Sequence, residues 1–163
     1  MPNIDFRFAW QKPDLAFVRD AKAFWNEIGA IMTPAEIDER VSQLCALAYE
    51  GGQVTAISTV HLFDYPRLRS RFFYYRTAVG PNFRRRKLAS RLCVYSRDRL
   101  AEWSREHPEQ KMKGLFIVLQ AEEFQSREHA PVIAQLDLRL ILVGYTPNGY
   151  RMRVEWFSDA SVE

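Results

Sequence analysis

The stretch of sequence that decides the fold lies in the middle of the chain and reads Val79-Gly80-Pro81-Asn82-Phe83-Arg84-Arg85-Arg86-Lys87-Leu88-Ala89-Ser90-Arg91-Leu92. It follows Arg71–Val79, whose aromatic and β-branched residues are typical of a strand, and Gly80-Pro81-Asn82 predicts a turn at its end. Apolar residues then recur at three- and four-residue steps from Leu88 to about Arg105, which predicts an amphipathic helix. A strand, a basic turn and a helix start therefore follow one another.

The basic turn has the properties of an anion site. Backbone N–H groups without an acceptor and the positive end of the helix dipole converge where a helix begins, and both favour a bound phosphate. Arg84, Arg85, Arg86 and Lys87 add charge at the same point. The sequence therefore predicts a phosphate-binding loop. The alternative is a solvated, arginine-rich helix start without a ligand.

At these residues the chain resembles the GNAT superfamily of acyl-CoA-dependent N-acyltransferases. The phosphate loop of that family follows an Arg/Gln-x-x-Gly-x-Gly/Ala pattern after a strand, and here the pattern falls on Arg84-Arg85-Arg86-Lys87-Leu88-Ala89. Val79 and Pro81 stand where such proteins carry Val-x-Pro, and Phe83 stands at an aromatic position. One position departs from the pattern, because Lys87 replaces the usual glycine. A Cβ restricts both positive φ and close approach of the pyrophosphate, although the lysine ammonium could contact a phosphate directly.

The resemblance implies an α/β (α+β) fold with a central mixed, mostly antiparallel sheet of six to seven strands and about four flanking helices. It also implies transfer of an acetyl group from acetyl-CoA, or of another acyl group, to a primary amine by direct attack. Backbone groups near Ala78 and Val79 would pair with the pantetheine amide, and N–H groups from about Arg86 to Ser90 would bind the pyrophosphate. The cofactor-binding residues expected from the resemblance are Ala78, Val79, Arg84, Arg85, Arg86, Lys87, Leu88, Ala89 and Ser90.

The general base expected of such an enzyme has no obvious candidate on the central strands. Members of the family commonly place a glutamate there, where this chain has Arg76 and Thr77. The candidates are His61, at the end of the predicted strand Val54–Leu62 where the loop His61–Arg69 begins, and Glu122 or its neighbour Glu123 beyond the apolar strand Gly114–Gln120. A histidine with an ordinary pKa near ~6.5 suits a base at neutral pH. The alternative for each candidate is a solvated polar residue.

The general acid also departs from the pattern. Many members carry a tyrosine on the last helix, four residues before a Gly-aromatic pair; that pair is Gly144-Tyr145 here, and the tyrosine position holds Leu140. Tyr145 and Tyr150 are the nearest replacements. Both could equally be core or hairpin aromatics.

The rest of the chain predicts an element order that agrees with the resemblance. Hairpin turns are expected at Gly51-Gly52 and at Thr146–Gly149, and helix N-caps at Asp14 and at Thr33, the latter forming a capping box with Glu36. The other expected elements are a strand over Ile4–Trp10, strands over Leu44–Tyr49 and Val54–Leu62, a last helix from Pro131 to Val143, and a final strand over Tyr150–Phe157.

Length and composition predict one domain over residues 1–163, with 158–163 as a loose tail. The chain has 163 residues, 47% of them hydrophobic, and a net charge of +3. No apolar run approaches the roughly 18–20 residues of a membrane span, so we expect a cytoplasmic protein that does not bind membranes. Cys45 and Cys93 are expected in the core, and the histidine spacing supports no metal site.

Two other functions remain open at this level. The chain could hold CoA or acyl-CoA with little or no turnover. Lys87 and Leu140, which both depart from the family pattern, suggest this function. It could also be a basic nucleic-acid-binding module, although no ribonucleoprotein signature or helix-turn-helix spacing accompanies the arginines. The identity of the acceptor amine stays open, and a homodimer formed through the terminal hairpin is conceivable.

Overall fold

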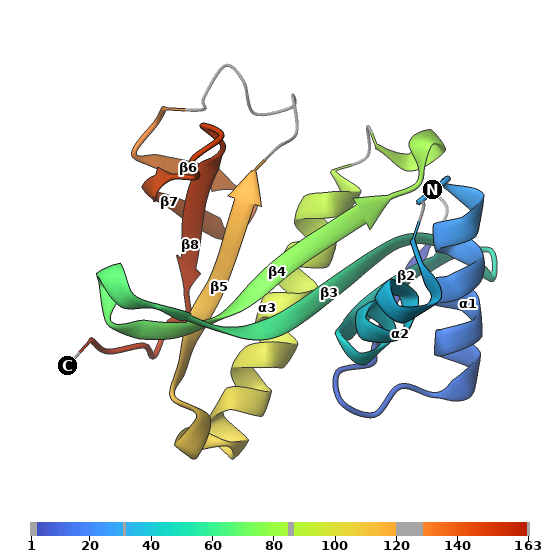
Figure 1. Cartoon of the computed structure of the whole chain (residues 1–163), viewed down its shortest axis with the longest axis horizontal. Helices are drawn as coiled ribbons and strands as arrows, with labels where there is room; N and C mark the ends of the chain where they lie inside the picture. Colours follow the sequence, from blue (N-terminus) through green and yellow to red (C-terminus); the bar gives the residue numbers. More distant parts are fainter. Residues whose placement is uncertain (1–2, 31, 85–86, 120–128, 163) are drawn as a thin grey trace. The chain divides into compact units, whose positions relative to one another are not determined.

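A computed structural model of the chain describes residues 3–30, 32–84, 87–119 and 129–162 (Figure 1). Its three α-helices are α1 (Leu15–Glu27), α2 (Pro34–Ser42) and α3 (Leu88–Glu106). Short 3-10 turns lie at η1 (Pro66–Leu68), η2 (Pro81–Phe83) and η3 (Pro108–Gln110). The strands are β1 (Ile4–Phe8), β2 (Leu44–Glu50), β3 (Gln53–Tyr65), β4 (Ser70–Val79), β5 (Met112–Leu119), β6 (Val132–Gln135), β7 (Leu138–Tyr145) and β8 (Arg151–Trp156).

The strands form one mixed sheet in the order β1-β2-β3-β4-β5-β8-β7-β6. The pair β4/β5 is parallel, whereas β1/β2, β2/β3, β5/β8, β8/β7 and β7/β6 are antiparallel. This confirms the predicted α+β class with a mostly antiparallel sheet. The described residues contain eight strands and three α-helices, where the sequence predicted six to seven strands and about four helices.

The missing helix is the one predicted over Pro131–Val143, and that prediction was wrong. The segment forms the β6/β7 hairpin, with Ile133 opposite Leu140 and Gln135 opposite Leu138. Its apolar residues fit a helical spacing, but Leu138 and Leu140 also alternate, and both are buried on one face of the hairpin. Leu136, at the turn, has a left-handed φ of 53°. The sequence gives no glycine or asparagine there to mark the turn.

By internal contacts the described chain divides into two compact units. Unit 1 comprises residues 1–60 and 77–96, and unit 2 comprises residues 61–76 and 97–163. In unit 1, α1 packs on β2 and β3 through Phe24 and Trp25, which are 3% and 5% exposed. The first half of α3 joins this unit, since the Ser96 hydroxyl lies 2.9 Å from that of Ser58 and Tyr95 stacks on Phe6.

The helix starts of unit 1 follow the sequence signals. The Asp14 carboxylate accepts a hydrogen bond of 2.9 Å from the Ala16 N–H and caps α1. At α2 the Thr33 hydroxyl and the Glu36 carboxylate form the predicted capping box, and hydrogen bonds from Thr33 lower the pKa of Glu36. Gly51 and Gly52, both at positive φ, form the predicted turn between β2 and β3.

Unit 2 is built around β5 and an aromatic cluster. Tyr65, Phe72, Phe116 and Val154 are buried together, with Phe116 in contact with both Tyr65 and Phe72. A side chain at Gly114 would overlap the Glu155 carbonyl, so glycine lets β5 and β8 pair at this point. Figure 1 shows β5, β8 and β7 as adjacent strands of this unit.

Unit 2 also contains a partly buried ionic network centred on Arg97 of α3. The Arg97 guanidinium donates to Glu155 of β8 at 3.0 Å and to Asp137 of the β6/β7 turn at 2.6 Å. It also donates to Asp98 at 2.8 Å. The second Glu155 oxygen accepts from the Arg139 N–H at 2.6 Å, so one carboxylate joins α3 and β7. Burial raises the pKa of Glu155 despite the opposing effects of Arg139 and Arg97, whereas hydrogen bonding to Arg97 lowers the pKa of Asp137.

The lowered pKa of Asp137 predicts a pH dependence of stability. Because the folded-state pKa lies below the unfolded value of about 3.9, the folded state binds fewer protons in that range. This contribution is complete above the unfolded pKa and is lost as pH falls through the folded one. We expect the free energy of unfolding in urea to fall more steeply on acidification below about pH 5 in the wild type than in Asp137→Asn. The control is Asp159→Asn, whose carboxylate lies 3.9 Å from Arg105; an unchanged slope in Asp137→Asn would contradict the assignment.

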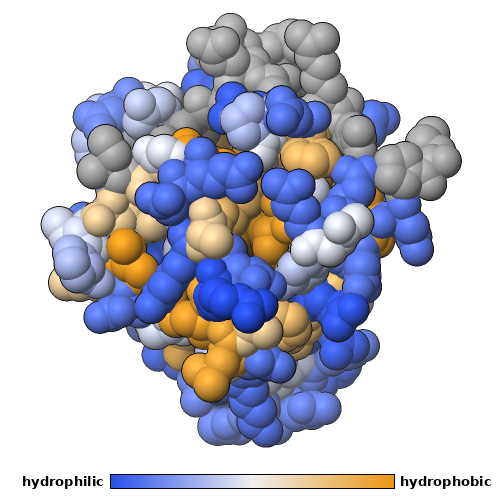
Figure 2. Space-filling model, turned by 90° about the vertical axis from the view of Figure 1, so that its right-hand side faces the viewer, coloured by the Kyte–Doolittle hydropathy of each residue, from blue (hydrophilic) through white to orange (hydrophobic). Residues whose placement is uncertain are grey.

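Both cysteines are buried, as expected of core residues, and within the described residues neither forms a disulfide. Burial raises the pKa of the Cys45 thiol to about 12. The described helices include none with the length and hydropathy needed to cross a membrane. In the described ranges no group of three or more His, Cys, Asp and Glu side chains is placed to hold a metal ion. Figure 2 shows a face on which hydrophilic residues predominate and hydrophobic residues gather in separate patches.

Candidate functional site

The candidate site begins where β4 ends, in unit 1. The Gly80 N–H donates to the Thr55 carbonyl of β3 at 2.8 Å, and the Phe83 N–H donates to the Gly80 carbonyl at 2.9 Å. A Cβ at Gly80 would come within 3.3 Å of both Phe83 and the Thr55 carbonyl, so a small residue suits this corner. The strand therefore ends in a tight 3-10 turn, η2, as the sequence predicted.

Lys87 precedes α3 in a left-handed conformation, with φ at 52°. Its carbonyl accepts from the Arg91 N–H at 3.0 Å, and Leu88 and Leu92, 1% and 0% exposed, fix the helix on the core. The residue that replaces the family's glycine thus takes the positive φ that a glycine adopts most easily. A non-glycine residue in this region costs about 1–2 kcal/mol, which packing of α3 must offset.

The start of α3 supplies the chemistry of an anion site. Leu88, Ala89 and Ser90 form the first turn of the helix, where backbone N–H groups lack helical acceptors. Ala89 is partly exposed between the buried Leu88 and Ser90, so the accessible side chain at the helix N-terminus is a small one. The side chains of Arg84 and Lys87 are exposed and form no ion pair with the residues the structure describes. The geometry suits a phosphate group at the helix N-terminus.

Three predicted site residues, Arg85, Arg86 and Glu122, lie outside the described residues, and so does Glu123. Ala78 and Val79 form the end of β4, as predicted, and Ala78 packs against the core of unit 1. Nearby, the Thr77 hydroxyl donates to the Ile57 carbonyl at 3.2 Å. The last residues of β4 are therefore held in place up to the turn.

His61, the candidate base in unit 2, lies within β3, in agreement with its place at the end of the predicted strand Val54–Leu62. The strand continues to Tyr65, so only the last part of the predicted loop His61–Arg69 leaves the sheet. The imidazole stacks on the Tyr74 ring at 4.9 Å, and the Arg76 guanidinium lies 5.1 Å from the same ring. His61 is partly exposed. A stacked histidine on a strand keeps a fixed ring orientation, which suits a proton acceptor as well as a structural role.

Tyr145, the candidate acid, is a surface residue at the end of β7. It is 44% exposed, and its hydroxyl lies 2.7 Å from Nδ1 of His129. The alternative of a core aromatic is therefore excluded for Tyr145, and Tyr150, 38% exposed, is also a surface residue. The sequence did not indicate a role for His129, because its partner Tyr145 lies 16 residues away. The β6/β7 hairpin between them brings the two side chains together.

The loop residues 78–84 and 87–90 belong to unit 1, whereas His61, His129 and Tyr145 belong to unit 2. Unit 1 thus contains a strand, a tight turn and a helix start suited to a phosphate. In unit 2 the candidate groups for proton transfer are a stacked imidazole and a phenol paired with an imidazole.

Comparison with known proteins supports the same fold. No protein-family model matches the sequence, and no curated protein matches it. Among solved structures, a GNAT-family acetyltransferase from Streptococcus pneumoniae aligns with a TM-score of 0.51 at 14% identity, covering 94% of this chain and 97% of the other. Arabidopsis thaliana NAA60 in complex with acetyl-CoA aligns with a TM-score of 0.54 at 12% identity, covering 95% and 99%.

A third similar structure is N-acetylglutamate synthase from Neisseria gonorrhoeae, complexed with coenzyme A and L-arginine. It aligns with a TM-score of 0.58 at 12% identity and covers 97% of this chain, but only 34% of the synthase. The sequence identities to these three structures are low. What this chain shares with them is the course of its backbone, over nearly its whole length. The chain has the fold of the GNAT acetyltransferases.

Proposed function

We propose that the protein is an N-acyltransferase that moves an acetyl group from acetyl-CoA to a primary amine. The observation that carries this proposal is the helix start after β4, where Lys87 adopts the positive φ expected of a glycine in the family pattern. The GNAT fold supports it, and the Arabidopsis structure of this fold holds acetyl-CoA. Cofactor binding at such a loop depends mainly on backbone N–H groups, which a sequence comparison at 12% identity does not detect.

In the proposed complex the pyrophosphate of acetyl-CoA accepts hydrogen bonds from N–H groups between Arg86 and Ser90. Arg84, Arg85 and Lys87 neutralise its charge, and backbone groups of Ala78 and Val79 pair with the pantetheine amide. The amine nitrogen attacks the thioester carbonyl, the N–C bond forms, and the C–S bond breaks. The base, His61 or Glu122, takes the ammonium proton before attack, and Tyr145 protonates the leaving thiolate. The nitrogen releases its second proton to water as the C–S bond breaks, and the Tyr145 phenolate regains a proton from water.

The proposal is tested first by calorimetric titration with acetyl-CoA and with CoA at low and physiological salt, with ATP as a control of charge. Binding in the micromolar range that persists at physiological salt and exceeds that of ATP is the expected result. Transfer is then tested on a panel of small-molecule and peptide amines, and the release of free CoA thiol is measured. Binding equal to that of ATP would contradict an acyl-CoA site.

Replacing Ala89 by leucine should weaken acetyl-CoA binding by at least about tenfold, because a bulky side chain at the first turn of α3 obstructs the helix N-terminus. The charge of the loop is unchanged, so a calorimetric titration reports obstruction alone. The matched control is Ala101→Leu, a partly exposed position on the same helix. Normal binding by Ala89→Leu would show that the loop has been assigned wrongly.

The role of Lys87 is separated from its backbone conformation by two substitutions. Lys87→Gln removes the charge and keeps the Cβ, whereas Lys87→Gly removes both and fits φ of 52° without strain. Since an exposed charge contributes about 0.2–1 kcal/mol, we expect both variants to bind acetyl-CoA only a few-fold more weakly in the same titration. Tighter binding by Lys87→Gly than by the wild type would mean that the lysine Cβ hinders the pyrophosphate.

An acyl-CoA-binding protein with little or no turnover is the second candidate function. The observation that favours it is the residue four positions before Gly144-Tyr145, which is Leu140. It lies on β7 and not on a helix, is 4% exposed and has no proton to give. Binding of acetyl-CoA without acetylation of any amine in the panel would support this function. The weaker alternative, a nucleic-acid-binding module, predicts retention of random DNA or RNA on filters at physiological salt.

A further inference from the structure

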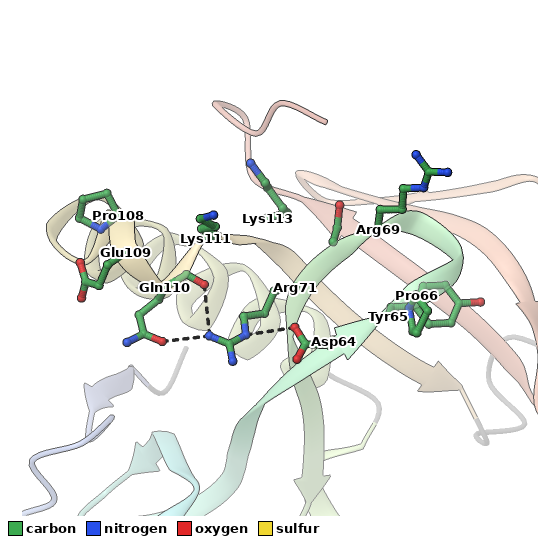
Figure 3. A pocket seen from close by; sticks show the side chains of 11 residues that line it. Asp64, Tyr65, Pro66, Arg69, Arg71, Pro108, Glu109, Gln110, Lys111 and Lys113 are labelled. Carbon is green, nitrogen blue, oxygen red and sulfur yellow. Dashed lines mark hydrogen bonds and ion pairs between the residues drawn. The ribbon is translucent and has the colours of Figure 1, made fainter. Parts of the chain in front are cut away.

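A second charged site lies in unit 2, at the other end of β4 from the loop. A cleft of about 770 Å³ opens between the β3-η1-β4 hairpin and the segment from η3 to the start of β5 (Figure 3). None of its lining residues belongs to the loop after β4. The cleft is lined by four cationic side chains, Arg69, Arg71, Lys111 and Lys113, and by two carboxylates, Asp64 and Glu109.

One of the four cations is already paired. Arg71 donates to the Asp64 carboxylate at 3.2 Å and to the side-chain oxygen of Gln110 at 3.1 Å, as Figure 3 shows. These bonds connect β3, β4 and η3 and fix one wall of the cleft. The Arg71–Asp64 pair also balances one positive charge with one negative charge. The remaining charged groups of the cleft are three cations and one carboxylate, Glu109, and they determine which ligands it attracts.

The three remaining cations are unpaired with respect to the described part of the chain. The side chains of Arg69, Lys111 and Lys113 form no hydrogen bond or ion pair there. Arg69 and Lys111 are exposed, and Lys113 is partly exposed. Three positive groups gathered around one concave surface repel one another, and an anion of charge two or more relieves that repulsion.

The backbone presents two of these cations in an unusual way. Arg69 follows η1 and Lys111 follows η3, and both residues are left-handed, with φ at 48° and 54°. Each N–H donates to the carbonyl of the proline that opens its turn, at 3.0 Å for Arg69 and 3.1 Å for Lys111. Glycine or asparagine would take this conformation at a lower cost. Two separate turns therefore place a basic residue at a position where stability alone favours glycine.

We propose that this cleft binds a small polyvalent anion that carries carboxylate or phosphate groups. Its volume lies within the about 300–1,000 Å³ of small-molecule sites and exceeds what a single phosphate needs. The bound anion accepts hydrogen bonds from Arg69, Lys111 and Lys113, while Arg71 holds the wall against which it lies. The site is independent of the proposed acyltransferase function, since it requires neither the loop nor acetyl-CoA.

The test uses citrate as the carboxylate probe and inorganic pyrophosphate as the phosphate probe, each titrated into the full-length protein at physiological salt. Amide chemical shifts locate the binding. We expect one or both probes to bind and to shift the amides of Arg69, Ser70 and Lys111. The double variant Lys111→Gly/Lys113→Gln should weaken this binding at least about tenfold, since it removes two of three charges and glycine tolerates the left-handed φ.

The matched control is Arg84→Ala/Lys87→Gly, which removes two charges from the loop after β4 and should leave citrate binding in the cleft unchanged. Thermal unfolding of both double variants verifies that they fold, and Arg69→Gly provides a second test at a position that also favours glycine. The proposal is overturned if neither probe shifts the cleft amides, or if both double variants weaken binding equally, because either result means that only the overall charge attracts the probes.

Discussion

Replacing Arg97 by alanine should lower the free energy of unfolding by about 3–5 kcal/mol, measured by urea denaturation at neutral pH. Arg97 and Glu155 are 11% and 6% exposed in their side chains, and their closest atoms lie 3.0 Å apart. Removal of the guanidinium leaves the Glu155 carboxylate buried with only the Arg139 N–H as a donor. The cost of an uncompensated buried charge exceeds what a surface ion pair contributes.

The control for this prediction lies two residues along the same helix. Arg99 pairs with Glu102 at 3.4 Å, and both side chains are about half exposed. Arg99→Ala should therefore change stability by no more than about 1 kcal/mol. The double variant Arg97→Met/Glu155→Met should recover part of the stability lost in Arg97→Ala, because it removes the isolated carboxylate. Equal effects of Arg97→Ala and Arg99→Ala would show that the network contributes no more than an exposed pair.

The features that the sequence predicted well are determined by local chemistry. Asp14 and Thr33 mark the helix starts through their own backbone contacts, and Gly51-Gly52 marks a turn because it permits positive φ. The start of α3 belongs to the same class, since the apolar period from Leu88 determines where the helix packs. Each signal lies within a few residues of the structure that it predicts.

The features that escaped prediction depend on residues far apart in the chain. Arg97 and Glu155 are 58 positions apart, and Arg71 meets Gln110 across 39 positions. The β6/β7 hairpin was predicted as a helix because its apolar residues fit both periods, and pairing with β8 decides in favour of a strand. Only the fold brings such partners together, so neither the Arg97 network nor the basic cleft has a local signature.

Replacing Tyr145 by phenylalanine should lower kcat for acetyl transfer about 10²-fold, the lower end of the range for a positioned acid, and leave acetyl-CoA affinity unchanged. The phenol O–H of a tyrosine can be donated to a thiolate. Nδ1 of His129 lies 2.7 Å from the phenol oxygen. With a proton on Nδ1, His129 donates to that oxygen, leaves the O–H free for the thiolate, and stabilises the phenolate that results.

The matched control is Tyr150→Phe, which removes a phenol of similar exposure from the same hairpin and should change kcat less than about twofold. His129 acts through Tyr145, so His129→Leu should reduce kcat less than Tyr145→Phe does, and His129→Gln, which retains a donor, should recover part of that loss. A normal kcat in Tyr145→Phe would assign protonation of the thiolate to water and leave Tyr145 as a surface residue.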